Sequence, residues 1–402
     1  MSTYYDLIIV GGGLVGASLA CALRHTALKI AVIEAASWSQ QQSPPSYDDK
    51  VIALSYASKQ IFTGIGNWHA IASHASPIRH IHISDQGHFG FAHLSHQLAN
   101  LPALGYVVRA KHIGHALQAT LQDSNVDLIA PAQLVQIQAD TQHVEITVNQ
   151  DEQTQTLHTK LVVAADGGKS QVKRLLDIQQ RQYDYQQTAV IANVTLEKHH
   201  QYTAYERFTH TGPFALLPLQ GNDCSLVWTV KRHDIQTVMA WSDTQFLHQL
   251  QQQFGWRLGK FLNVGKRMVY PLRLMQTKSH NVPRVVIIGN AAHTLHPVSG
   301  QGLNLGLRDV ASLAEVITHY GNIGSQEFLK QYYARQKPDQ QQVINLTDLL
   351  VHLFSNNLPP LVIARNLGLS VLDSLPFLKK QFIRQMTGLN AHTSHLVRGL
   401  SV

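Results

Sequence analysis

The first apolar segment of the chain, Leu7–Val10, is β-branched at three of its four positions and ends in glycine. A short uninterrupted apolar run that stops at a turn signal is typical of a strand buried on both faces of a parallel sheet. Good helix formers follow at Ala17–Leu23, and a second apolar run covers Ile30–Ile33. The pattern therefore predicts a strand, a glycine turn, a helix and a second strand at the start of the chain.

Two later apolar runs end in the same way. The run that begins at Leu161 leads into Asp166–Gly167, and a polar turn then precedes a helix that should start near Ser170. The run Val285–Ile288 ends at Gly289, and a loop follows before the next helix. Two more buried strands, each followed by a glycine-containing turn and a helix, are therefore expected.

Between residues 183 and 275 the pattern changes to strand-like runs with alternating apolar and polar positions. Glycine-containing or polar turns separate these runs. A period of two predicts an antiparallel sheet with one face buried.

The region after Pro338 is different again. A short polar run gives way to apolar, amphipathic segments. Prolines should divide this region into short helices; they are Pro359, Pro360 and Pro376. The simpler interpretation is a helical cap that buries its apolar side against the rest of the protein. The alternative is an apolar surface for a partner protein or a membrane, with Lys379, Lys380 and Arg384 near its end.

Composition narrows the class of protein. The 402 residues carry a net charge of +7 with neutral histidine, and 44% of them are hydrophobic. A basic balance suits nucleic acid, anionic lipid or an anionic cofactor. No Lys/Arg run or basic-aromatic stripe is present, which argues against nucleic acid. The 24 histidines are scattered without a metal-ligand spacing, so no metal site is expected.

Cysteine use and the N-terminus bear on the compartment. Two unclustered cysteines, Cys21 and Cys224, argue against a disulfide framework and favour a reducing compartment. No basic segment precedes the first apolar run, and no later stretch reaches the ~18 apolar residues of a transmembrane helix. We therefore expect a cytoplasmic protein, and peripheral contact with the inner membrane stays open.

The first glycine turn carries candidate chemistry. Gly11, Gly13 and Gly16 fit the G-x-G-x-x-G spacing of a dinucleotide-binding turn, and Glu34 lies 18 residues after the last glycine. The first glycine permits the tight turn, the second lets a pyrophosphate approach the backbone, and the third allows close packing of the helix. Glu34 would accept hydrogen bonds from a ribose diol and would repel a 2′-phosphate. This turn alone leaves FAD and NAD open.

The three glycine-ended strands resemble those of the class A flavoprotein aromatic hydroxylases, whose fold is that of p-hydroxybenzoate hydroxylase. In that family a DG motif like Asp166–Gly167 touches FAD and the pyridine nucleotide. A GD motif like residues 289–309 holds the ribityl chain and the isoalloxazine. The resemblance implies FAD contacts at Gly289, Asn290, Pro297, Gly300, Gln301, Gly302 and Asn304.

Within that family, the stretch GNAAHTLHPVSGQGLNLGLRD is most similar to the ubiquinone-biosynthesis branch and to its 2-polyprenyl-6-methoxyphenol hydroxylases. The wider family usually has Asp where this chain has Asn290, and that branch commonly carries Asn. Asn keeps an acceptor oxygen for a ribityl hydroxyl and loses the charge. Lys50 stands where the family has an Arg in contact with FAD; Lys keeps the charge and loses the planar fork.

The resemblance also implies an α/β fold with a discontinuous Rossmann-type FAD-binding domain, an antiparallel β-sheet substrate domain and C-terminal helices. The FAD-binding domain would comprise residues 1–75, 103–180 and 280–335. The substrate domain would comprise residues 76–102 and 181–279, and its sheet would cover the flavin ring and wall the substrate pocket. Residues 336–402 would form the helical region.

The function implied by the resemblance is flavin-dependent hydroxylation of a polyprenylated phenol in ubiquinone biosynthesis. NADH or NADPH would reduce FAD, and O2 would then give a flavin C4a-hydroperoxide that oxygenates the ring. Partners would be the prenylated phenol and O2, with other quinone-biosynthesis proteins and a membrane as open options. His293 and His296 are candidate bases for ionising the phenol. We favour the simpler interpretation that they hydrogen-bond the backbone of their loop.

Other functions remain compatible with an FAD site. An FAD-dependent prenyl-lipid reductase, or a non-catalytic flavin-binding member of a biosynthetic complex, would carry the same motifs. A halogenase is disfavoured because the chain has no W-x-W-x-I-P stretch. A plain NAD dehydrogenase is disfavoured because it would not need the second and third glycine turns.

Overall fold

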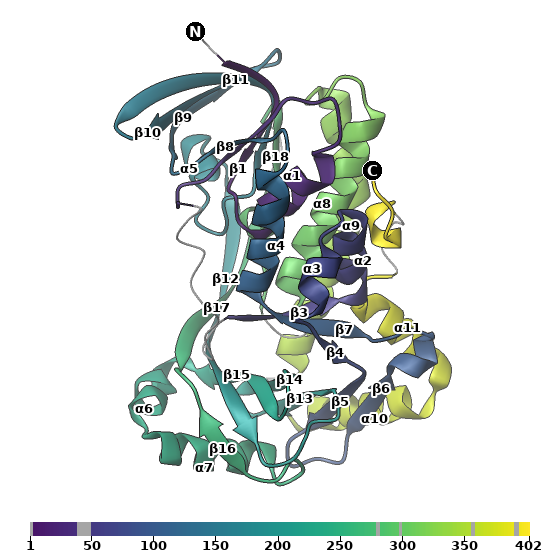
Figure 1. Ribbon diagram of the computed structural model, residues 1–402. Coiled ribbons are helices and arrows are strands. Elements are labelled where there is room, and N and C mark those ends of the chain that lie inside the picture. Colours follow the sequence, from purple (N-terminus) through teal and green to yellow (C-terminus); the bar gives the residue numbers. More distant parts are fainter. Residues whose placement is uncertain (1–2, 38–49, 279–281, 297–299, 355–357, 390–393) are drawn as a thin grey trace.

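The computed structural model in Figure 1 describes residues 3–37, 50–278, 282–296, 300–354, 358–389 and 394–402. Within these residues the chain forms a seven-stranded sheet, a nine-stranded sheet and a three-stranded sheet. In the view of Figure 1 the seven-stranded sheet lies at the top, the nine-stranded sheet at the bottom, and the small sheet between them.

The seven-stranded sheet contains the glycine-ended strands predicted from the sequence. Its strands are β1 (Thr3–Val10), β2 (Ile30–Ile33), β8 (Asp127–Ile129), β9 (Gln133–Ala139), β10 (Val144–Gln150), β11 (Gln153–Ala164) and β18 (Val285–Ile287). Five of them run parallel in the order β8-β2-β1-β11-β18. Strands β10 and β9 continue from β11 as an antiparallel extension. The three strands that the apolar runs predicted are therefore confirmed.

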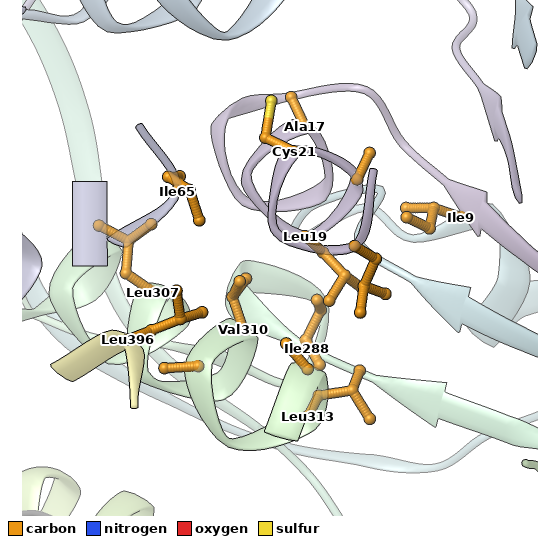
Figure 2. Close-up of a cluster of buried hydrophobic side chains, with 14 of the residues drawn as sticks. Ile9, Ala17, Leu19, Cys21, Ile65, Ile288, Leu307, Val310, Leu313 and Leu396 are labelled. Carbon is orange, nitrogen blue, oxygen red and sulfur yellow. The ribbon is translucent and has the colours of Figure 1, made fainter. Parts of the chain in front are cut away.

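Helices α1 (Leu14–Leu23), α4 (Ala110–Gln122) and α8 (Gln301–His319) pack together beside this sheet. Figure 2 shows part of their shared core, in which Leu19 of α1 lies near Ile288 and the α8 residues Val310 and Leu313. These four side chains are fully buried. Burial of each such side chain stabilises the fold by about 1.5–3 kcal/mol, so this contact fixes α1 and α8 relative to the strand ends.

The three-stranded sheet is formed by β3 (Val51–Ser55), β7 (Gly105–Arg109) and β4 (Ser76–Ile78), all paired antiparallel. Two short helices follow β3: α2 (Tyr56–Gly64) and α3 (Trp68–Ala72). A third short helix, α5 (Gln171–Leu175), packs against β9 of the seven-stranded sheet. Helix α2 packs against α8 and the short 3-10 helix Leu396–Arg398. Strand β3 contacts α8 and strand β4 contacts β14, so the small sheet lies between the two larger sheets.

The nine-stranded sheet has the order β19-β17-β12-β15-β14-β13-β5-β6, with β16 paired to β12. Its strands are β5 (His80–Asp85), β6 (Phe91–Ser95), β12 (Gln180–Leu196), β13 (Thr203–Thr209), β14 (Gly212–Pro218), β15 (Asp223–Lys231), β16 (Phe261–Val264), β17 (Met268–Thr277) and β19 (His293–Thr294). The sheet is antiparallel as expected, except that β13 pairs with β5 in parallel. The alternation pattern could not show this pairing, because β5 comes from a distant part of the chain.

The two faces of this sheet have different partners. One face packs its apolar side chains, such as Phe214 and Trp228, against Phe246 and its neighbours on α7 (Asp243–Phe254), with α6 (Ile235–Ala240) alongside. On the opposite face, strand register aligns one residue from each of five neighbouring strands. This cross-sheet row consists of Ile191, Val227, Ala215, Glu206 and Ile83. The row is apolar except for Glu206.

Helix α9 (Gln326–Phe354) runs for 29 residues and contains Pro338. The suggested boundary at 335/336 therefore falls inside this helix. An internal proline costs a helix about 3 kcal/mol. Tertiary contacts on both sides offset that cost: Tyr332 is fully buried, and Asp339 pairs with Arg308 at 2.7 Å. The division of the chain into domains stays a prediction.

The remaining helices, α10 (Pro359–Ser374) and α11 (Pro376–Met386), begin at the prolines that the sequence marked as breaks. Among the described residues, no single helix is long and apolar enough to cross a membrane. Helices α10 and α11 meet that criterion only when taken as a pair, and the pair is bent by 101°.

A buried ion pair joins α10 to the hairpin of β5 and β6. The guanidinium of Arg365 donates to both carboxylate oxygens of Asp85, at 2.7 and 3.1 Å. Asn366 donates to the same carboxylate at 2.8 Å and accepts from the Gly90 amide at 2.6 Å. Asp85 and Arg365 are both buried, so each needs charge compensation, and the second ionisable neighbour of Asp85, His88 at 3.2 Å, carries a charge only when protonated.

We expect Arg365→Met to lower the free energy of unfolding by about 3–5 kcal/mol, because it leaves the buried Asp85 carboxylate without its cationic partner. Urea denaturation followed by circular dichroism would measure this loss. The control is Lys160→Met, which removes an ion pair with Asp6 whose lysine side chain is 53% exposed. That variant should lose less than about 1 kcal/mol. Equal losses in the two variants would contradict the role given to Arg365.

Candidate active site

The three glycine turns come together at one edge of the seven-stranded sheet. Val10 of β1 lies opposite Ala164 of β11, and Ala164 lies opposite Ile287 of β18. Because the three strands are parallel neighbours, their carboxyl ends share this edge and so do the turns that follow. The three turns, distant in sequence, therefore converge, as the expected discontinuous FAD-binding domain requires.

Two glycines let backbones touch at this edge. Gly11 has a φ of +103°, and a Cβ there would lie 2.6 Å from the carbonyl oxygen of Ala165. A Cβ on Gly16 would overlap the carbonyl oxygen of Gly11. The first and third glycines of the motif therefore have the roles that their positions predicted: one forms the tight turn and the other packs α1 closely.

Three other glycines face open space. A Cβ on Gly13, Gly167 or Gly302 would meet no other group within 4 Å. All three line one cavity with a volume of about 800 Å³. Helices α1 and α8 begin at Leu14 and Gln301, so their unpaired amide groups lie beside this cavity. Bare backbone and helix N-termini form a cradle that suits the phosphates and ring edge of a dinucleotide.

Two acids lie beside the glycine turns. Glu34 ends β2 beside the first turn, and its carboxylate accepts from the amides of Gly12 at 2.7 Å and Ala36 at 2.9 Å. One oxygen of Asp166 accepts from the Val172 amide at 3.1 Å, while its Oδ1 is buried without a partner. An unpartnered buried carboxylate oxygen at the glycine edge is consistent with a ligand hydroxyl group. The residues present therefore fit FAD.

The other residues expected to contact the cofactor do not all line this cavity. Lys50, Asn290 and Gly300 line the same cavity. Gln301 is buried but lines smaller neighbouring cavities, and its amide lies 3.4 Å from the Met386 carbonyl oxygen. Pro297 lies outside the described residues.

Asn304 was expected to contact the cofactor, yet its side chain is fully bonded within the protein. Its Oδ1 accepts from the Ser55 amide at 2.8 Å and from the Ser58 hydroxyl at 2.7 Å. Its amide nitrogen donates to the carbonyl oxygens of Ala53 at 2.9 Å and Gly300 at 2.8 Å. We therefore propose that Asn304 positions the Gly300 turn against β3 rather than touching the cofactor.

Asp309 has a similar role that the sequence did not reveal. This fully buried carboxylate accepts from the Gly289 amide at 2.9 Å and bonds His293 Nε2 at 2.7 Å. Its other oxygen accepts from Gln336 at 2.6 Å and Gln340 at 2.9 Å, both on α9. Asp309 therefore joins α8, α9 and the turn after β18. Asp309 ends the motif stretch 289–309, but its partners could not be identified from the sequence because they come from separate elements.

The two histidines considered as bases do not line the 800 Å³ cavity. His293 is buried against Asp309, and His296 is buried edge-on to the Tyr185 ring. Burial lowers the pKa of His296 to about 4, so it is neutral and weakly basic near pH 7. We therefore propose that both histidines have structural roles. The partner of His293 is the side-chain carboxylate of Asp309, whereas we had expected backbone groups of the loop. No group of three metal-ligating side chains occurs among the described residues.

The rest of the cavity wall is mainly apolar. The cross-sheet row forms one side of it, and the C-terminal helices close it with residues such as Leu353, Phe354, Leu369 and Phe382. The Phe354 ring stacks on Phe208 of β13 with centroids 3.5 Å apart. The expected position of the nine-stranded sheet, as a wall beside the glycine turns, agrees with this arrangement.

Glu206 is the acidic residue in this wall, and sequence reasoning overlooked it. Its Oε1 is buried without a partner, and burial raises its pKa from 4.5 to about 8. The residue retains some accessible surface, which lines the cavity. A signal was present: in Ala204-Tyr-Glu-Arg-Phe208, strand alternation puts the acid on the same face as Ala204 and Phe208.

Comparisons with known proteins agree with this geometry. Residues 4–347 match the family model described as an FAD binding domain. The chain is 35% identical to ubiquinone hydroxylase UbiL of Rhodospirillum rubrum, over 98% of this chain and 93% of that protein. It is 32% identical to 3-demethoxyubiquinol 3-hydroxylase of Escherichia coli, over 96% of this chain and 98% of that protein. The chain belongs to the FAD-dependent hydroxylases of ubiquinone biosynthesis.

A solved structure supports the fold of this hydroxylase family member. The p-nitrophenol 4-monooxygenase PnpA from Pseudomonas putida DLL-E4 superimposes with a TM-score of 0.80, covering 98% of this chain and 100% of that one at 17% identity. The expected p-hydroxybenzoate-hydroxylase-like fold is thus confirmed. The protein is an FAD-dependent monooxygenase.

We expect Gly13→Asp to yield protein without flavin, because a carboxylate would enter the open space at the glycine turn and repel a pyrophosphate. Visible absorbance of the purified variant after incubation with FAD would measure this. The control is Gly321→Asp, at another glycine whose Cβ would meet no group within 4 Å and which lies away from the cavity lining. The control should keep its flavin; full flavin content in Gly13→Asp would contradict the site.

A second prediction concerns pH and stability. The folded state raises the pKa of Glu206, so between pH 4.5 and about 8 it binds more protons than the unfolded state. Stability from this group is therefore lost as pH rises through that window. Glu206→Gln should be more stable than wild type by a margin that grows to on the order of a few kcal/mol near pH 8 and then levels off. Denaturation of both proteins across pH measures it; a constant margin would contradict the assignment.

Proposed function

We propose that this monooxygenase hydroxylates the ring of a prenylated phenol on the route to ubiquinone, using NADH or NADPH and O2. The observation that carries the proposal is the cavity of about 800 Å³ that joins the glycine turns to an apolar chamber. A chamber of this kind suits an apolar ring with a prenyl chain. The names of the two relatives, a ubiquinone hydroxylase and a 3-demethoxyubiquinol 3-hydroxylase, support a substrate of this class.

The residues of the chain have distinct tasks in this reaction. When bound, FAD supplies the redox and oxygen-transfer chemistry. Gly13 and the N-terminus of α1 would bind the pyrophosphate, and Glu34 would bind the ribose. The amides at Gly300 and Gly302 would stabilise negative charge at the ring edge. Lys50, which is exposed at the cavity, adds positive charge on the same side.

The walls must also keep water from the reacting atoms. The nine-stranded sheet and the C-terminal helices supply this barrier through Ile191, Val227, Leu353 and Phe354, whose side chains cannot hydrogen-bond water. The Arg365–Asp85 pair fixes α10 over the chamber. A mutation that loosens α10 should therefore increase unproductive consumption of the reductant.

We further propose that α10 lies against a membrane. Its outward face carries Ile363, Leu367 and Val371, spaced four residues apart, and Leu375 and Phe377 continue this apolar surface. Phe377 is 74% exposed and Leu367 is 53% exposed. An exposed apolar stripe on an amphipathic helix is typical of contact with a lipid surface.

Two further observations favour lipid over a partner protein. Ala364 and Gly368 lie on the exposed side of α10 and also line the cavity, so the cavity reaches the surface at the stripe. A lipid substrate could then enter from the bilayer. Lys380 and Arg384 are exposed on the adjacent α11, where they would meet anionic head groups.

The reaction is tested with the purified protein, FAD, a reductant, labelled O2 and a prenylated phenol. We expect one labelled oxygen atom in the ring of the product and faster oxidation of the reductant when the phenol is added. The precursor that accumulates in a quinone-pathway mutant lacking this protein would identify the hydroxylated position.

Other outcomes would point to the rival functions. Reduced product without label would indicate a prenyl-lipid reductase. Bound FAD with no phenol-stimulated oxidation of NADH or NADPH would indicate a non-catalytic member of a biosynthetic complex. Either result would overturn the proposed hydroxylation.

The membrane contact is tested by sedimentation with vesicles of phosphatidylethanolamine and phosphatidylglycerol. Replacing Ile363 and Leu367 by Glu should weaken binding at least about tenfold, because two aliphatic side chains that become buried in the bilayer contribute several kcal/mol to the binding free energy. The control is Val135→Glu; Val135 is 50% exposed on β9, in the distant upper part of Figure 1. Unchanged binding in the double variant, or no binding by wild type, would contradict the contact.

A further inference from the structure

A phenol that enters an apolar chamber brings a hydroxyl group that needs a hydrogen-bond partner. An unpartnered buried hydroxyl costs free energy, so a site that accepts phenols must supply a polar group near the ring. This inference rests on the proposed function and asks which side chain supplies that group.

Among the residues that the structure describes, six with polar or ionisable side chains line the cavity: Lys50, Tyr205, Glu206, Asn290, Thr294 and Arg365. Arg365 is already bonded to Asp85, and the Thr294 hydroxyl donates to the backbone at 3.2 Å. Lys50 is exposed.

Tyr205 and Asn290 are also committed elsewhere. The Tyr205 ring packs edge-on against Phe254 at 5.4 Å, on the face of the sheet covered by α7. Asn290 lies in the glycine turn assigned to the cofactor. Of these six described residues, Glu206 remains as the one whose side chain has an unpartnered buried oxygen.

The position of Glu206 fits the task. In the cross-sheet row its neighbours are Ala215 on one strand and Ile83 on the other. Neither neighbour can hydrogen-bond the carboxyl, and the small Ala215 leaves room beside it. The carboxyl therefore stands among apolar side chains on the wall that would face a substrate ring.

We propose that Glu206 binds the phenolic hydroxyl of the substrate and so fixes the orientation of the ring in the chamber. The neutral carboxyl can both donate and accept a hydrogen bond. The contact gives specificity for phenols over rings that lack the hydroxyl, because such rings would leave the carboxyl without a partner.

The electrostatic surroundings keep Glu206 neutral near pH 7. Burial is the cause of its raised pKa of about 8. The charged side chains that share the cavity are Lys50, which is exposed beside Tyr270, and Arg365, which is compensated by Asp85. Arg207, on the same strand, alternates to the other face of the sheet. Substrate binding would bury the carboxyl further and favour its neutral form still more.

The test compares Glu206→Met, Glu206→Gln and the control Glu145→Met, which makes the same change on β10, away from the cavity lining. We expect Glu206→Met to lower kcat/KM for a prenylated phenol by about 10–100-fold while flavin content stays unchanged. Glu206→Gln should stay within about threefold of wild type because its amide also donates and accepts. Glu145→Met should stay close to wild type, because the Glu145 side chain is 42% exposed and does not line the cavity.

Two readouts separate this role from a structural one. Wild type should bind the phenol more tightly than the same prenylated ring without its hydroxyl, and Glu206→Met should lose that preference. Affinity of wild type should fall as pH rises through about 8, while Glu206→Gln should stay flat across that range.

The outcomes also distinguish this inference from the proposed function. If wild type hydroxylates the phenol and Glu206→Met matches it in rate and in preference for the hydroxyl, the role of Glu206 is wrong and the function stands. If wild type neither binds nor hydroxylates any prenylated phenol, the proposed function fails and this inference fails with it.

Discussion

The structure depends on backbone-to-backbone contact at the edge where β1 and β11 end. Gly16 of α1 sits directly against the Gly11 carbonyl group, and the Gly11 turn sits against Ala165. Any side chain at these points would push helix α1 off the sheet. The close fit brings the α1 N-terminus beside the turns after β11 and β18, and only then can three separate loops face one cavity. The cofactor site therefore depends on the lack of side chains at Gly11 and Gly16.

Two buried carboxylates connect this edge to the rest of the molecule. Asp309 ties the turn after β18 to α8 and α9, and Asp85 ties the β5–β6 hairpin to α10. Each accepts several hydrogen bonds from elements far apart in the sequence, which is how a buried charge is tolerated. Helix α9 contacts the first of these networks near Gln336 and reaches the chamber at Phe354. The cofactor edge and the chamber are thus held by one continuous helix.

Local patterns predicted the parts of the fold that local forces determine. The apolar runs before Gly11, Asp166 and Gly289 predicted three strands because a buried parallel strand has no polar positions. Partners that lie far apart in the sequence could not be predicted. Asn304 accepts a hydrogen bond from the amide of Ser55, 249 residues away, and the motif alone does not reveal this bond. The passage of α9 through Pro338 likewise depends on tertiary contacts. The alternation pattern could have placed Glu206 on the same face as Ala204 and Phe208. Which face of the sheet lines the chamber could be known only from the assembled structure.

The place where the chamber reaches the surface has a consequence for substrate choice. Ala364 carries only a methyl group and Gly368 has no side chain, and the space beside Gly368 is open. If α10 lies against a membrane as proposed, the aromatic head would enter here while most isoprene units stay outside among the acyl chains. Substrate recognition would then not depend on the number of isoprene units, and one enzyme could act on quinone precursors with prenyl tails of any length.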